Sequence, residues 1–157
     1  MKNKIQYYKF LSDLYLLASR SYNQDFKYHK FILLLSIIEL FDNNYFIENK
    51  IYLDKALLNS YTKHINYFSK TSSSIRPWYP FYHLRSSPFW NHKIKLNMEY
   101  SYKILKSEQG LKAINSVIEY GYFEENVFLL IMDEKIRSKI ENLIISILIE
   151  NLDESNE

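Results

Sequence analysis

The sequence predicts a mainly α-helical, compact domain with a small β-hairpin around residues 79–96. Apolar residues recur at steps of three and four over residues 3–20, which is the period of an amphipathic helix. A second segment, residues 27–42, is apolar on nearly every side through residues 31–41, as expected of a central buried helix. Short aromatic-rich runs favour strands around residues 79–96. With 157 residues, the chain has the size of one ordinary domain.

The first two predicted helices follow from these patterns. Ile5, Tyr8 and Leu11 begin the apolar face of the first helix, and its opposite face is polar. A polar connection over residues 21–25 leads to the second helix, which Asn43-Asn44 ends.

The third helix begins after Asp54, a residue type that caps helix N-termini by accepting hydrogen bonds from backbone amides. It extends to about Phe68 and follows a short extended link over residues 47–53. Residues 70–77 then form a polar connection without apolar periodicity.

Two aromatic-rich runs follow, Trp78 to Leu84 and Phe89 to Leu96. They are separated by Arg85-Ser86-Ser87-Pro88, in which serine and proline favour a turn. Aromatic residues are enriched in strands. We therefore expect the two runs to pair as a β-hairpin.

Three more helices complete the predicted fold. The first covers residues 108–120 and ends at Gly121, which we expect in a left-handed C-cap conformation. The next is a short helix over residues 124–132, and Asp133 opens the last one, which reaches about Asn151.

The composition indicates one intracellular domain, residues 1–152, followed by a frayed acidic tail, residues 153–157. The chain has no cysteine, which excludes disulfides and thiolate metal sites and favours a reducing compartment. The apolar run over residues 31–38 is much shorter than the roughly 20 residues that cross a bilayer. The N-terminus lacks the apolar core of a signal peptide. We therefore expect a cytoplasmic protein without membrane contact.

Charge is distributed unevenly along the chain. Residues 1–106 contain 16 Lys and Arg against 7 Asp and Glu, whereas residues 107–157 contain 4 against 11. No acidic residue lies between Asp54 and Glu99, and this basic stretch favours a polyanionic partner. A composition shifted toward Lys, Asn, Ile and Tyr by a low-GC genome explains the same excess without a partner. The stretch contains Lys55, Lys63, Lys70, Arg76, Arg85, Lys93 and Lys95, together with His64, His83 and His92.

Catalytic motifs are lacking in the sequence. There is no GxSxG motif, and a chain with two glycines contains no glycine-rich phosphate loop. His83 and His92 suggest a zinc pair, but neither cysteine nor carboxylate lies near them in sequence, and we expect no metal. Glu124, Glu125 and Asp133 are more typical of helix N-termini than of a cation site. We expect neither an enzyme nor a cofactor.

Residues 76–85 combine aromatic rings with an arginine at each end, and such a combination suits base stacking and phosphate contact. With two further stretches, this segment resembles the sulfur-binding domain that precedes the HNH nuclease in many bacterial modification-dependent restriction endonucleases. The similar residues are His29-Lys30 before the apolar residues 31–35; Tyr79-Pro80-Phe81-Tyr82-His83-Leu84-Arg85 with Phe89-Trp90; and Gly121-Tyr122-Phe123 through Phe128-Leu129-Leu130 to Asp133 and Arg137.

The resemblance implies a module that binds duplex DNA carrying a backbone phosphorothioate, within a restriction and defence system in which a separate nuclease cuts. Sulfur is larger, more polarizable and a poorer hydrogen-bond acceptor than oxygen, so an apolar hollow can prefer it. By resemblance, Tyr79 and Pro80 form this hollow, and His29 and Lys30 hold a phosphate or reach a base edge. The residues expected to neutralise flanking phosphates are Arg76, Arg85, Lys93 and Lys95.

His83 departs from the family's pattern, because the family has a small residue three positions after the proline. A histidine here fills the hollow or donates to an unmodified phosphate. Two alternatives therefore stay open: DNA binding without sulfur specificity, and a protein-interaction subunit that uses Trp78 and Tyr79. Ser87-Pro88 also replaces the family's Asp-Gly turn. The residues expected to be scaffold and not ligand contacts are Phe81, Leu84 and Trp90.

Overall fold

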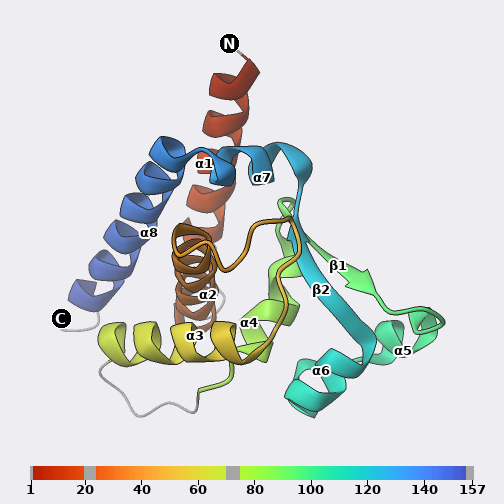
Figure 1. Cartoon of the computed structure of the whole chain (residues 1–157). Coiled ribbons are helices and arrows are strands. Elements are labelled where there is room, and N and C mark those ends of the chain that lie inside the picture. Colours follow the sequence, from red (N-terminus) through yellow and green to blue (C-terminus); the bar gives the residue numbers. More distant parts are fainter. Residues whose placement is uncertain (1, 20–23, 70–74, 155–157) are drawn as a thin grey trace.

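The computed structural model describes residues 2–19, 24–69 and 75–154. Within these residues the chain forms eight α-helices and one two-stranded antiparallel sheet, which confirms the mainly α-helical class (Figure 1). The helices are α1 (Lys2–Ser19), α2 (Gln24–Asp42), α3 (Lys55–Phe68), α4 (Trp78–His83), α5 (Glu99–Ile104), α6 (Leu111–Val117), α7 (Glu125–Met132) and α8 (Glu134–Glu154). The strands are β1 (Trp90–Ile94) and β2 (Ile118–Phe123), and two 3-10 turns are η1 (Leu84–Ser86) and η2 (Ser107–Gln109).

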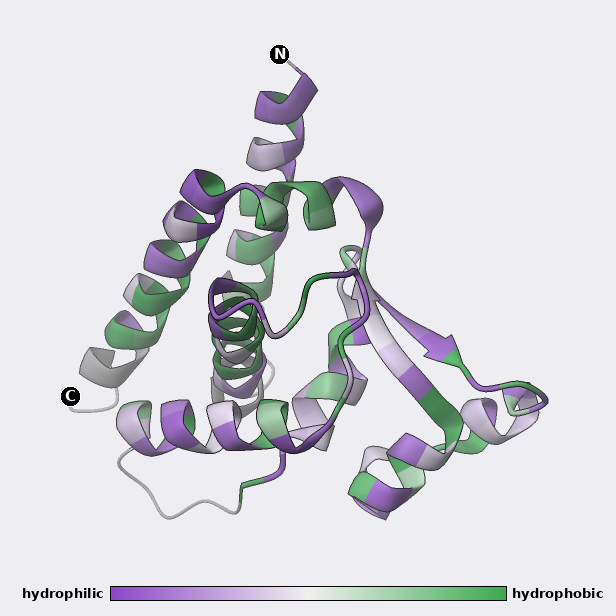
Figure 2. Ribbon diagram, in the orientation of Figure 1, coloured by the Kyte–Doolittle hydropathy of each residue, from purple (hydrophilic) through white to green (hydrophobic). Residues whose placement is uncertain are grey.

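The core is built around α2, which contacts α3, α4, α7 and α8. Residues 31–38 are all buried, so the predicted central helix is confirmed. Ser36 lies within this run, and its buried hydroxyl donates a hydrogen bond to the carbonyl of Ile32 at 2.7 Å. Figure 2 shows hydrophobic residues concentrated on α2 and α7. In Figure 1 the sheet, α5 and α6 extend away from this helical core.

Capping side chains define two helix starts as predicted. The Asp54 carboxylate accepts from the backbone N–H of Leu57 at 3.1 Å, at the start of α3. The Asp133 carboxylate accepts from the N–H groups of Lys135 and Ile136 at 3.0 and 3.1 Å, at the start of α8. None of the described helices combines the length and apolar character required to cross a bilayer.

Parts of three predicted segments lie outside the described residues. They are residues 21–23 of the first connection, residues 70–74 of the second and residues 155–157 of the acidic tail. The helix α8 continues to Glu154, beyond its predicted end at Asn151.

The predicted hairpin is correct in one strand and wrong in the other. β1 matches the second run, but it pairs with β2, and the first run forms the helix α4 instead. Proline lacks the N–H that a paired strand needs, whereas the first turn of a helix tolerates it. Pro80, Phe81 and Tyr82 are buried in succession, and a half-buried strand would show alternation.

The predicted helix over residues 108–120 is also divided. Only α6 is helical within it, apart from the turn η2, and the chain becomes β2 at Ile118. Gly121 is therefore a strand residue and no C-cap, and the glycine with positive φ is Gly110. A Cβ on Gly121 would collide with the indole of Trp90. Glycine is required here because the Trp90 ring lies directly against its Cα.

A third segment docks on β2 beside the sheet. Ile51 and Gly121 exchange two backbone hydrogen bonds of 2.8 Å each. The side chain of Asn49 continues this pairing, because its amide donates to the Phe123 carbonyl at 2.7 Å and accepts from the Phe123 N–H at 2.8 Å. The predicted extended link over residues 47–53 thus lies along β2.

Candidate nucleic-acid interface

Lys30 connects α2 to the turn after α4. Its side chain is 9% exposed, and its ammonium donates to the hydroxyl of Ser86 at 3.1 Å. Ser86 in turn donates to the carbonyl of His83 at 3.0 Å. The aliphatic stem of Lys30 therefore packs in the protein interior while the charge reaches the edge of η1.

Tyr79 and His83 are one helical turn apart on α4, so their side chains share a face. Their ring centroids are 4.8 Å apart. Nε2 of His83 lies 2.8 Å from the hydroxyl of Ser107, and the Tyr79 hydroxyl donates to Glu108 at 3.5 Å. The His83 ring therefore fills space beside Tyr79, where the resembled family has a small side chain.

Burial lowers the pKa of His83 to about 4, and the nearby charges of Lys30 and Arg85 lower it further than Glu108 can raise it. His83 is consequently neutral at pH 7. It presents an uncharged ring between two cations.

Arg85 lies on η1 at the protein surface. Its guanidinium is 4.1 Å from the ring centroid of Tyr82 and 5.4 Å from that of Tyr102. Cation–π contacts of this kind hold the planar cation in a defined orientation. A phosphate oxygen that approaches η1 therefore meets an oriented donor.

The remaining predicted site residues are distributed differently. Pro80 is buried, so its ring packs in the interior beneath α4 and does not form the wall of a surface hollow that the resemblance implied. His29 is half-buried next to Tyr28, and Arg76 is exposed just before α4. Lys93 points to the sheet face opposite Trp90 and His92, because side chains alternate along a strand. Lys95 is exposed beyond the end of β1.

The scaffold prediction is confirmed for all three residues. Phe81 is 1% exposed, Leu84 0% and Trp90 2%. They form the buried side of the aromatic segment.

His92 belongs to this scaffold, although the sequence analysis placed it in the basic stretch expected to face a polyanionic partner. Its ring stacks on Phe81 with centroids 5.4 Å apart. Nε2 lies 2.9 Å from the Phe81 carbonyl, and Nδ1 lies 2.9 Å from the Tyr102 hydroxyl. Burial lowers the pKa of His92 to about 4. The alternation in Trp90-Asn91-His92 was the signal that places His92 on the inner face.

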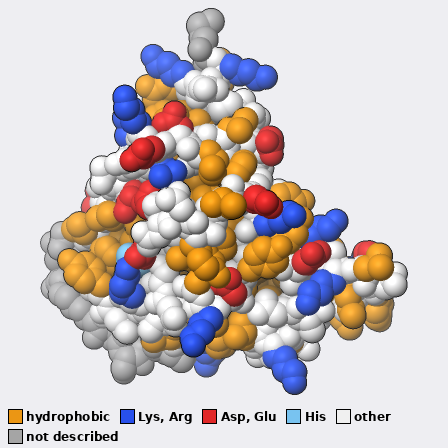
Figure 3. Space-filling model, viewed as in Figure 1, with side chains coloured by type: hydrophobic (Ala, Val, Ile, Leu, Met, Phe, Trp, Pro, Cys, Tyr) orange, Lys and Arg blue, Asp and Glu red, His pale blue; other side chains and the backbone are white. Residues whose placement is uncertain are grey.

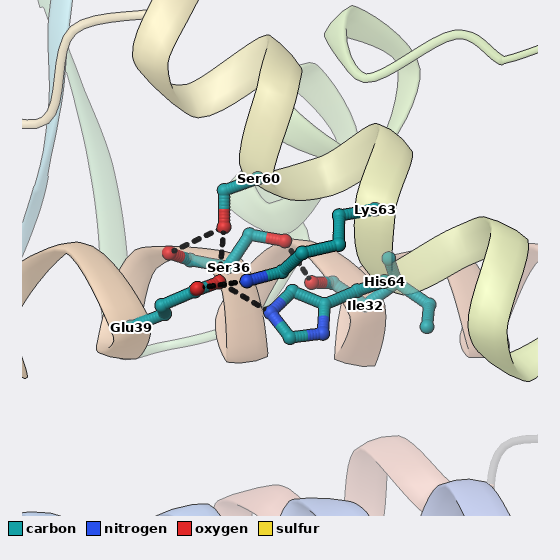
Figure 4. Close-up of polar contacts among 6 residues, drawn as sticks. All are labelled: Ile32, Ser36, Glu39, Ser60, Lys63 and His64. Carbon is teal, nitrogen blue, oxygen red and sulfur yellow. Dashed lines mark hydrogen bonds and ion pairs between the residues drawn. The ribbon is translucent and has the colours of Figure 1, made fainter.

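A second polar cluster lies between α2 and α3 (Figure 4). Glu39 accepts from Ser60 at 2.7 Å and from Nε2 of His64 at 2.5 Å, and it also pairs with Lys63. Burial raises the pKa of Glu39, but these partners together lower it to about 2. The basic stretch of the sequence is therefore partly neutralised in space by an acid from α2. Ser60 and His64 both face the carboxylate, so the imidazole does not activate the hydroxyl.

Across the described segments of the chain, no group of three or more His, Cys, Asp or Glu side chains is placed to hold a metal ion. His83 and His92 contact different partners, Ser107 and Tyr102.

The arrangement brings Lys30, Tyr79, His83 and Arg85 together into one surface, which we name the α2–α4 surface. It combines two cations with two rings, and this combination can hold an anion against an apolar wall. Comparison with known proteins assigns no family, because no protein-family model and no curated protein matches the chain.

Proposed function

We propose that the chain is a non-catalytic module that binds duplex DNA through its backbone at the α2–α4 surface, and that it prefers a phosphorothioate to a phosphate. The observation that supports this proposal most is the hydrogen bond between Lys30 on α2 and Ser86 on η1. Lys30 is 56 residues from Ser86 in sequence, yet its ammonium contacts that side chain beside His83 and Arg85. The first two resembled stretches thus meet at one surface.

The chemistry of this surface suits a modified phosphate. A phosphorothioate keeps its negative charge, so it still needs cations, and Lys30 and Arg85 flank the site. The sulfur is softer and accepts hydrogen bonds poorly, so it favours contact with a ring over a donor. Tyr79 supplies such a ring, beside the neutral imidazole of His83.

This proposal also gives the module a setting. With DNA as its partner, the proposed module acts in the cytoplasm, and its resemblance to the sulfur-binding domain implies a restriction or defence system. A separate nuclease subunit would supply cleavage.

A second candidate is binding of unmodified DNA, and the position of His83 favours it. The ring lies 4.8 Å from Tyr79 and takes up the space in which sulfur would sit. His83→Ala separates the two candidates. If the chain reads sulfur, the hollow that the substitution opens raises its preference for phosphorothioate DNA. If His83 instead donates to an unmodified phosphate, its loss weakens binding to modified and unmodified duplexes alike.

The direct test uses two duplexes of one sequence that differ in a single phosphorothioate, with affinity measured by fluorescence anisotropy at fixed salt. Lys30→Ala and Tyr79→Ala are each expected to weaken binding about tenfold, since a charged hydrogen bond and a ring contact are each worth about 1–3 kcal/mol. Lys135→Ala and Tyr67→Ala are matched controls on α8 and α3, where both side chains are exposed. Wild-type affinity in both site variants would rule out this surface.

A further inference from the structure

The outer face of the sheet carries a second group of rings and cations. In the register of β1 and β2, Asn91 lies opposite Tyr122 and Lys93 lies opposite Tyr120. Directly opposed residues project from the same side of an antiparallel pair. Trp90, His92 and Phe123 fill the inner side, so these four residues form the outer side.

The segment docked on β2 extends this outer face. Ile51 pairs with Gly121 and is 0% exposed, so it points inward. Its neighbours Lys50 and Tyr52 point outward by alternation. Contacts agree with this, because the Tyr52 ring is 5.6 Å from the Tyr120 ring and the Lys50 ammonium is 5.6 Å from the Tyr120 centroid.

We name this set the tyrosine platform: Lys50, Tyr52, Asn91, Lys93, Tyr120 and Tyr122. Its rings meet at steep angles, 66° between Tyr52 and Tyr120 and 69° between Tyr120 and Tyr122, so they do not stack on one another. Tyr52 is 42% exposed. Tyr120 and Tyr122 are half-buried, so part of each ring remains open to a ligand.

The charges beside the rings identify the kind of ligand. Lys50 and Lys93 are exposed among the tyrosines, and Lys95 is exposed at the end of β1. Glu48 lies 3.7 Å from Lys50, but an exposed pair of this kind is weak and exchanges readily with another anion. Figure 3 shows hydrophobic, basic and acidic side chains interspersed over the face of the molecule that is turned toward the viewer in Figure 1. Flat rings with interspersed lysines match a ligand made of flat bases and phosphates.

We infer that the tyrosine platform binds single-stranded nucleic acid, with bases stacked on the tyrosines and phosphates paired with Lys50 and Lys93. In a duplex the base faces are buried in the helical stack, so only an unpaired strand can use these rings. This surface is separate from the α2–α4 surface, since Lys93 points away from α4. The inference therefore stands whether or not the proposed reading of duplex DNA holds.

The experiment titrates the full chain into a fluorescein-labelled oligothymidylate of about 12 nucleotides, a length within the range of single-strand sites. Tyr120→Ala and Tyr122→Ala are each expected to weaken binding about tenfold, because one ring–base stack is lost. Tyr120→Phe and Tyr122→Phe keep the rings and are expected to bind like the wild type. Tyr67→Ala, which removes a tyrosine that is 81% exposed on α3, is the matched control and is expected to have no effect.

An abasic strand of equal length and charge isolates the stacking. Binding to it is expected to be at least tenfold weaker than to oligothymidylate. Tyr79→Ala is expected to leave the preference for oligothymidylate over the abasic strand unchanged, which separates this surface from the duplex site. Thermal unfolding by circular dichroism checks that each alanine variant is folded, and the comparison of the two strands with the wild-type chain remains decisive if one is not.

Three results would overturn the inference. They are absence of oligothymidylate binding, equal affinity for the abasic strand, and unchanged affinity in the folded alanine variants. Ring-dependent binding of a neutral oligosaccharide in place of the oligothymidylate would also overturn it and would assign the rings to sugar stacking.

Discussion

The two sides of α4 differ in what they contact. On one side, Phe81 is 1% exposed and packs edge-on against Trp90 with centroids 5.6 Å apart. On the other side, Tyr79 and His83 are half-buried and lie among polar and charged groups. One helix of six residues thus has a closed side and an open side.

This difference in burial separates scaffold from contact surface within one aromatic segment. Both sides of α4 carry aromatic rings, but only the rings of the closed side are buried. Changes on the closed side should therefore lower stability, and changes on the open side should lower ligand affinity. The following predictions test that division, from the largest expected effect to the smallest.

Phe81→Ala is expected to lower the free energy of unfolding by about 3–5 kcal/mol, because it leaves a cavity beneath Trp90 and His92. Chemical denaturation followed by circular dichroism measures this. Tyr79→Ala on the open side is expected to cost less than about 1 kcal/mol. Equal losses at the two positions would contradict the division.

Stability is expected to fall by about 2 kcal/mol between pH 7 and pH 5 on account of His92. Its folded pKa of about 4 lies below the ordinary value of 6.5, so the unfolded state binds more protons in this window. His83 adds a smaller amount because solvent reaches its ring. Glu39 acts only at lower pH, between its ordinary pKa and about 2, where protonation breaks its contacts.

Denaturant titrations of the wild type and His92→Gln at both pH values measure this effect. The variant should show a shallower pH dependence. An unchanged slope would mean that His92 is not held neutral between α4 and β1.

Gly121→Ala is expected to cost about 1–3 kcal/mol, because the added methyl meets the Trp90 indole and overpacks the closed side. The shift of the thermal midpoint measures it. Asn91→Ala, on the exposed face of the same sheet, serves as the control and should stay within about 0.5 kcal/mol of the wild type. A neutral Gly121→Ala would show that the strands can separate at this point.

Arg85→Lys is expected to have the smallest effect. It keeps the charge but loses the planar contact with Tyr82, which is worth about 0.5–1 kcal/mol at an exposed site. DNA affinity should fall about two- to fivefold, and stability should hardly change. A loss as large as that of Lys30→Ala would mean that Arg85 contacts DNA with both arms of its guanidinium.

The positions of the long helices α2, α3 and α8 could be predicted because their signals are local. Asp54 and Asp133 cap the helices that follow them, and the apolar run of residues 31–38 marks the central helix. Each signal lies within one or two turns of its effect.

Strand pairing could not be predicted in the same way. β1 and β2 are separated by more than twenty residues, and pairing at that distance depends on tertiary packing. Gly121 was interpreted as a helix stop, although its role is to admit the Trp90 ring. Pro80 was the local sign against a strand over residues 78–84.

The candidate site could likewise be predicted only in part. The sequence identified Lys30, Tyr79, His83 and Arg85, and the structure brings these residues together. It separates Lys93 from them, because the side of a strand on which a lysine lies depends on which face is buried. The partners of His83, such as Ser107, are distant in sequence and carry no local signal.

The most direct test of the central claim is the affinity of the chain for paired duplexes with and without one phosphorothioate. We predict tighter binding to the modified duplex and loss of that preference in Tyr79→Ala. Equal affinity for the two duplexes would remove the sulfur preference. Failure to bind either duplex would contradict the assignment of the α2–α4 surface to DNA.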